Sequence, residues 1–136
     1  MPSETAFTDG THRPASPTLR LRDLAVSSTA ALFEGRRAGA GISMFVTRTP
    51  PGAAVGLHVH PYPETFLLLE GRGRWTRGDE VVELGPEDLL VVPPGTPHGF
   101  RNVGDVPLTV SSPESGELDQ TFLGVIRTDA RRGSRG

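Results

Sequence analysis

Two histidines separated by a single residue, followed by a proline-rich turn and a glutamate, constrain the fold of this chain more than any other feature. On a strand, His58 and His60 would point to the same face, because strand side chains alternate with a repeat of two residues. The segment Pro61-Tyr62-Pro63 must turn the chain, since proline is not tolerated inside a strand. Glu64 then opens the next strand, so two imidazoles and a carboxylate can meet on one side of a sheet.

A third imidazole follows in the segment PPGTPHGFRN at residues 93–102, where His98 comes after a proline–glycine turn. Two or three histidines with a carboxylate are a typical ligand set for a divalent transition metal. The alternative is that these polar residues are satisfied by hydrogen bonds alone, but burying them in a small domain without a cation would be costly. The fourth histidine of the chain, His12, lies in a polar N-terminal segment, and we expect it to be solvated.

The spacing of these residues resembles the two sequence motifs of the cupin superfamily. The first motif, G-x5-H-x-H-x3-E-x6-G, is matched at every position by Gly52, His58, His60, Glu64 and Gly71. The second, G-x5-P-x-G-x2-H-x3-N, is matched by Pro93, Gly95, His98 and Asn102. Its leading glycine position holds Glu87, and we expect the nearby Gly85 to serve that turn. The resemblance covers residues 40–112 and implies an all-β, single-domain jelly-roll β-barrel, or double-stranded β-helix, with the metal inside.

Composition agrees with a β-protein rich in turns. The chain has 136 residues, the size of one domain, with 17 glycines and 13 prolines and little helical periodicity. We expect a flexible N-terminal arm at residues 1–18, the barrel at 19–126 and a flexible basic tail at 127–136. A net charge of −2 gives no reason to expect nucleic acid or a membrane surface as a partner. The absence of cysteine and of an apolar leader fits a cytoplasmic protein.

Short alternating or apolar segments between turn residues predict the strands. We expect them at residues 19–22, 28–33, 42–49, 55–60, 65–70, 72–77, 80–84, 88–92, 98–101, 106–111 and 120–126. Residues 36–41 are expected to form a loop, and Gly78-Asp79 a hairpin turn. The apolar run at 65–70 predicts a strand buried on both faces or at a subunit contact. That run, on a small barrel, also predicts a homodimer with sheet-to-sheet contact.

A few apolar residues are candidates for the wall of a substrate pocket. Phe66 and Leu68 share the face of Glu64 by alternation, Phe100 shares the face of His98, and Met44 could reach the site from a neighbouring strand. Core packing is an equally good interpretation of all of these, because core and pocket merge in a small barrel. We expect Tyr62 to point outward from its turn. For Trp75 we expect packing or a dimer contact.

Four protein ligands would leave two positions of a six-coordinate ion free. We expect one divalent transition metal per chain, with Fe(II) or Mn(II) favoured and nickel, cobalt and zinc left open. The resemblance implies a dioxygenase-like oxidoreductase acting on a small organic molecule. There Glu64 would also act as the catalytic residue, by favouring the higher oxidation state of the ion. The alternatives are a non-redox isomerase, cyclase or decarboxylase, or a non-enzymatic metal-binding or small-ligand-binding protein.

Overall fold

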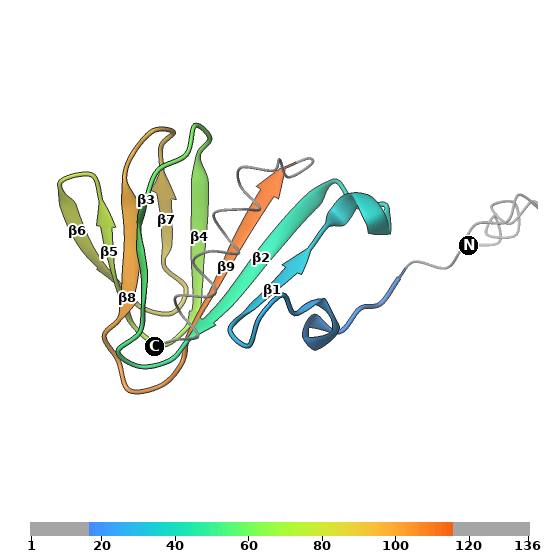
Figure 1. The fold of residues 1–136 in the computed structure, drawn as a ribbon, viewed down its shortest axis with the longest axis horizontal. Helices are drawn as coiled ribbons and strands as arrows, with labels where there is room; N and C mark the ends of the chain where they lie inside the picture. The colour runs from blue at the N-terminus through green and yellow to red at the C-terminus, as the bar shows by residue number, and fades with distance from the viewer. Residues whose placement is uncertain (1–16, 116–136) are drawn as a thin grey trace, which may run out of the picture.

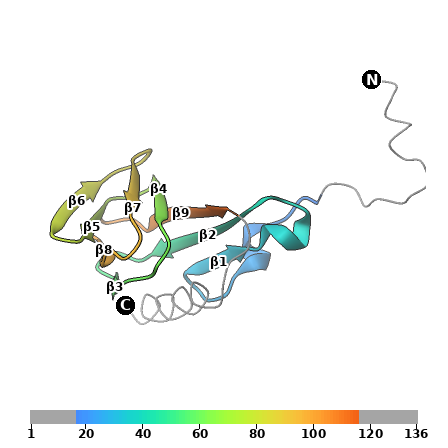
Figure 2. The ribbon, with the colours of Figure 1, turned by 90° about the horizontal axis from the view of Figure 1, so that it is seen from above.

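The computed structural model describes residues 17–115, and in this part of the chain strands form two antiparallel sheets (Figure 1). The larger sheet has the strand order β1-β2-β9-β4-β7 and the smaller has β3-β8-β5-β6. The strands are β1 (Ala30–Phe33), β2 (Ile42–Thr49), β3 (Ala54–His58), β4 (Glu64–Glu70), β5 (Gly73–Arg77), β6 (Glu80–Leu84), β7 (Leu89–Val92), β8 (His98–Asn102) and β9 (Leu108–Ser115). Figure 2 shows β4 and β7 lying over the smaller sheet, while β1 and β2 extend beyond it. The predicted all-β jelly-roll architecture is confirmed.

Apolar side chains from both sheets form one core in the barrel interior. They are Phe66, Leu68, Trp75, Leu84, Leu90, Val92, Phe100, Leu108 and Val110. Trp75 is fully buried and stacks on Phe100, with 4.6 Å between the ring centroids. A Cβ atom on Gly73 would lie 2.4 Å from Cζ3 of Trp75, so only glycine leaves room for the indole here. Of the two roles predicted for Trp75, the structure shows core packing.

Of the two interpretations of the apolar run at 65–70, burial on both faces is wrong, because the two faces of β4 differ in exposure. Glu64, Phe66 and Leu68 are buried, whereas Thr65 and Leu67 are half-buried and Leu69 is exposed. The run is therefore buried on one face only. Its outer face continues onto β7, where Leu89 and Val91 are exposed. The homodimer stays a prediction, and this outer face of β4 and β7 is the apolar surface that we propose for it.

Two short segments take up 3₁₀ helices where a strand or a loop was expected. The predicted strand at residues 19–22 is wrong, because Leu21–Leu24 form the 3₁₀ helix η2. Leu21 and Leu24 are three residues apart, so one side of a 3₁₀ turn carries both, and they are the half-buried members of this helix. The expected loop at 36–41 contains the 3₁₀ helix η3 (Gly35–Ala38). The strand predicted at 120–126 lies outside the described residues.

No helix within residues 17–115 is long and apolar enough to cross a membrane.

The turn before β7 keeps a backbone conformation that favours glycine, although the chain has a glutamate there. Glu87 has a φ of 75°, and it is the one non-glycine residue with a positive φ in the described part of the chain. The Asp88 N–H donates to the Gly85 carbonyl at 3.1 Å, which makes Glu87 the third residue of the turn. Gly85 was expected to supply the glycine conformation. It does not, because its φ is not positive and its N–H instead donates to Oδ2 of Asp88 at 2.7 Å.

The substitution Glu87→Gly should therefore stabilise the protein. A left-handed conformation costs a non-glycine residue about 1–2 kcal/mol, and the larger unfolded-state entropy of glycine offsets about 0.5–1 kcal/mol of that gain. We expect the free energy of unfolding to rise by about 0.5–1 kcal/mol, measured by urea denaturation. Glu87→Ala keeps the strain and is the matched control. Equal stability of the two variants would contradict this account of the turn.

Candidate metal centre

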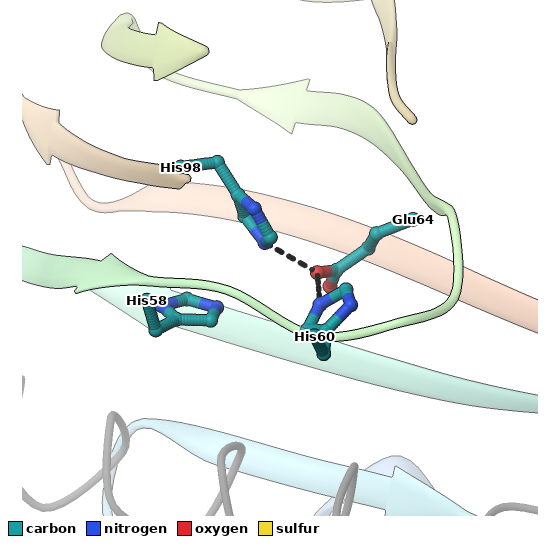
Figure 3. A group of neighbouring side chains, drawn as sticks. All are labelled: His58, His60, Glu64 and His98. Atoms are coloured by element: carbon teal, nitrogen blue, oxygen red, sulfur yellow. Dashed lines mark hydrogen bonds and ion pairs between the residues drawn. The ribbon is translucent and has the colours of Figure 1, made fainter. Parts of the chain in front are cut away.

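The four residues selected from the sequence come together at one end of the barrel interior (Figure 3). His58 is the last residue of β3, Glu64 the first of β4 and His98 the first of β8. His60 lies in the turn between β3 and β4. One potential ligand atom from each of the four residues lies within 4.8 Å of the others. The predicted ligand set is therefore assembled by three strands and one turn.

The route by which His60 reaches the cluster differs from the prediction. The expected strand at 55–60 ends at His58, and its pairing with β8 is irregular between Val55 and His58. The strand repeat therefore does not place His60. Instead, its carbonyl accepts a hydrogen bond from the Gly95 N–H at 2.9 Å, so the turn is held against the loop before β8. The loop that carries His98 also positions His60.

Each of the three imidazoles is oriented by a hydrogen bond from Nδ1 to a backbone carbonyl two residues away. The acceptors are the carbonyls of Gly56 for His58, Tyr62 for His60 and Thr96 for His98, each at 2.8 Å. A carbonyl can only accept, so each Nδ1 carries the proton. This leaves Nε2 as the ring nitrogen available for a metal, and outer hydrogen bonds of this kind fix ligating histidines in metal sites.

The carboxylate of Glu64 is the centre of the cluster, and its two oxygens have different partners. Oε1 lies 3.0 Å from Nε2 of His60 and 3.1 Å from Nε2 of His98. Oε2 accepts a hydrogen bond from the Ser112 hydroxyl on β9 at 3.2 Å. Glu64, His60 and His98 are all buried, with at most 6% of each residue exposed. The carboxylate thus joins the imidazoles of the smaller sheet to a strand of the larger one.

The electrostatics show what kind of group the cluster can hold. Burial alone would lower the pKa of His60, but the hydrogen bond to Glu64 and its negative charge outweigh burial and raise that pKa. Burial alone would raise the pKa of Glu64, but the hydrogen bonds from His60 and His98 lower it to about 2. Desolvation lowers the pKa of His58. Both ring nitrogens of His60 face oxygen acceptors, which an imidazole satisfies only when it is protonated.

This donor set fits a divalent transition metal. A cation at the centre would face three nitrogen ligands and one anionic oxygen, which is a set that such ions prefer. It would also compensate the negative charge of the buried Glu64 carboxylate. The residues therefore fit the group predicted from the sequence.

The predicted pocket residues lie in different places. Phe66 is next to the cluster, with its ring centroid 6.1 Å from that of His98 and 6.0 Å from that of Phe100. Leu68 is fully buried two residues further along β4. Whether Phe66, Leu68 or Phe100 touches a substrate stays a prediction.

Met44 is the exception among the predicted pocket residues. Met44 and Phe45 are neighbours on β2, so they point to opposite faces of the sheet. Phe45 pairs with Ser112, whose hydroxyl reaches Glu64, so the face of Phe45 is the interior one. Met44 therefore lies on the outer face, and its prediction as a pocket residue is corrected.

Two residues near the cluster were not predicted to be there. Tyr62, expected to point outward, stacks on His60 with parallel rings 4.2 Å apart, so that expectation is wrong. Its carbonyl, held by Nδ1 of the same histidine, keeps the turn folded back on the ring. Ser112 is 48 residues from Glu64 in sequence, and no motif marks it. The alternation of β9 indicates that Ser112 shares the face of Val110, but only the pairing of β9 with β2 and β4 shows which face is inside.

Comparisons with known proteins agree with this geometry. The family model described as "Cupin domain" matches residues 45–112. An uncharacterized protein of Methanocaldococcus jannaschii, MJ1618, is 40% identical over 62 residues, which are 45% of this chain and 50% of that protein. Quercetin 2,3-dioxygenase of Bacillus subtilis is 44% identical over 54 residues, which are 38% of this chain and 16% of that enzyme. The matched part thus spans half or less of these relatives.

A solved structure supports the fold. Oxalate decarboxylase of Bacillus subtilis, in a study of its Mn(II) centres, superposes with a TM-score of 0.64 and 19% sequence identity. The superposition covers 82% of this chain and 34% of that one. At this identity the likeness concerns the fold alone.

We expect the protein to bind one metal ion per chain through these four residues. A His58→Ala/His98→Ala double variant should lose affinity by more than the roughly 10–100-fold that removal of an outer hydrogen-bond partner costs. Elemental analysis and a titration with Mn(II) measure this. His12→Ala is the control and should behave as wild type. Unchanged metal content in the double variant would end the assignment.

Metal affinity should fall as the pH decreases. Ligation needs Nε2 of His60 without its proton, and the raised pKa of His60 means that protons compete with the metal even above the usual value of about 6.5. Glu64, with a pKa of about 2, stays ionised throughout. We expect Mn(II) to bind about tenfold or more weakly at about pH 6 than at about pH 8, with protons released on binding. Isothermal titration in buffers of different ionisation enthalpy measures both, and a pH-independent affinity would refute this.

Proposed function

This chain belongs to the cupin superfamily, and on that premise we propose that it is a metal-dependent oxidoreductase of dioxygenase type acting on a small organic molecule. The observation that carries the proposal is the convergence of three imidazole nitrogens and one carboxylate oxygen within 4.8 Å in a buried cluster. The similarity of 54 residues of this chain to quercetin 2,3-dioxygenase supports it further. Because that likeness covers a small part of the enzyme, it does not indicate which molecule this chain would act on.

We propose Fe(II) or Mn(II) as the resident ion, held by His58, His60, Glu64 and His98. When bound, such an ion supplies a Lewis acid and a redox centre. Four protein donors leave two positions of a six-coordinate ion for substrate and O2, which is why these two metals are favoured. Manganese is also the metal named for the structurally similar oxalate decarboxylase. Nickel and cobalt fit the same donors.

The chain's own residues have three tasks in this proposal. The carbonyl acceptors of the Nδ1 protons keep all three imidazoles aimed at the centre without rearrangement. Glu64 contributes the one anionic ligand, lowers the net charge of the site and favours the higher oxidation state of the ion. The ring of Phe66, buried beside His98, and the ring of Phe100, buried beside Phe66, would exclude bulk water from the inner side of the site.

A second candidate function follows from the number of donors. Four protein ligands satisfy the usual coordination of zinc, which has no redox chemistry. If zinc is the native ion, we propose a non-redox isomerase, cyclase or decarboxylase, or a small-ligand-binding protein. The metal content of protein purified without added metal or chelator discriminates the candidates. Iron or manganese supports the oxygenase, and zinc the alternatives.

The proposed function predicts an open iron site. Protein loaded anaerobically with Fe(II) should bind nitric oxide, used as a surrogate for O2, and give the EPR signal of a high-spin iron–nitrosyl adduct. Glu64→Ala should lose this signal, because it removes the anionic ligand. Glu83→Ala changes an exposed carboxylate on β6 and is the matched control. If fully iron-loaded protein forms no adduct, the coordination shell is closed and the binding-protein alternative is favoured.

A further inference from the structure

Ser112 is a polar residue that is buried beside the four candidate metal ligands and belongs to neither sequence motif. It lies on β9, the strand between β2 and β4 in the larger sheet, and is 2% exposed. Its hydroxyl hydrogen bonds to Oε2 of Glu64 at 3.2 Å. None of the other three predicted ligands comes from this sheet, so Ser112 and Glu64 together form the larger sheet's side of the site.

The two oxygens of Glu64 are therefore already divided between two tasks. Oε1 points to Nε2 of His60 and of His98, the atoms that would share a metal with it. Oε2 is engaged by Ser112 on β9, the neighbouring strand of the same sheet. A carboxylate can bind a metal through one oxygen or through both. A hydrogen bond to the second oxygen favours the one-oxygen mode, because that oxygen already has a partner.

We propose that Ser112 is a positioning residue that holds Glu64 in one-oxygen coordination and so keeps two adjacent positions open on the ion. This inference rests on the metal site of the proposed function and deepens it. Without the hydroxyl, Oε2 would be buried without a partner, and a buried unsatisfied carboxylate oxygen is costly. Turning Oε2 to the ion removes that cost but occupies one of the two open positions. Ser112 would thereby decide whether the site accepts two exogenous donor atoms at once, as it must for substrate together with O2 or for a chelating substrate.

The position is suited to this role because its backbone is fixed from both sides. Ser112 pairs with Phe45 of β2 in an unbroken antiparallel register, and the neighbouring Ser111 pairs with Leu67 of β4. The hydroxyl therefore cannot follow Glu64 if the carboxylate rotates. Ser111 has its side chain on the opposite face of the same strand, which makes it a matched control.

The test counts water molecules on Mn(II) bound to the protein, by water relaxation and by ¹⁷O-labelled EPR, because each open position holds one exchangeable water. Wild type, Ser111→Ala and Ser112→Thr, which keeps a hydroxyl, should show two waters. Ser112→Ala and Ser112→Val should show one, with an altered zero-field splitting in the EPR spectrum. Threonine and valine have nearly the same shape, so that pair isolates the hydroxyl, and either valine or alanine carries the test if the other variant does not fold.

Two waters in Ser112→Ala or Ser112→Val would overturn the role of Ser112 while leaving the proposed function intact. One water in Ser112→Thr would do the same, because that variant keeps the hydroxyl. Wild-type protein that binds no Mn(II) and no Fe(II) would instead overturn the metal site, and the inference with it.

Discussion

The structure depends on one buried anion, the carboxylate of Glu64. It links the two sheets, because Glu64 lies on β4 of the larger sheet and its Oε1 meets the imidazole of His98 on β8 of the smaller one. Oε1 also meets His60 in the turn before β4, and Oε2 meets the hydroxyl of Ser112 on β9. An anion with so little exposure is stable only with compensating positive charge and a partner for each oxygen. Here Oε1 of Glu64 has the imidazoles of His60 and His98 as its partners, and Oε2 has Ser112. The same requirement is the reason why the four residues could hold a divalent cation.

The turns and loops around the cluster orient its ligands before any ion is present. Each imidazole is anchored by a backbone carbonyl two residues away, so orientation is supplied locally and does not depend on distant packing. The turn after β3 is held in addition by the Gly95 N–H and by the stacking of Tyr62 on His60. A ligand set arranged in this way loses little conformational entropy when an ion binds.

Beyond the cluster, the interior is filled and apolar. Phe66, Trp75 and Phe100 form a contiguous aromatic group with centroid separations of 4.6–6.0 Å, and Phe66 reaches the ring of His98. The cluster of candidate ligands thus lies on a buried, apolar base. This base makes electrostatic interactions at the centre stronger than they would be in water. It also explains why residues predicted to line a pocket, such as Leu68, are at the same time the core of the fold.

The sequence by itself determined the fold class and the four candidate ligands. His58, His60, Glu64 and His98 lie at fixed spacings around proline and glycine turns, and turns are local structure that neighbouring residues encode. Only the tertiary structure decided which face of a strand is interior. Alternation separates Met44 from Phe45, but either face of β2 is apolar enough to be the core, and the choice follows from pairing with β9. The role of Ser112 could likewise be identified only from the structure. Ser112 and Glu64 are 48 residues apart in sequence, and no local pattern encodes a hydrogen bond over that distance.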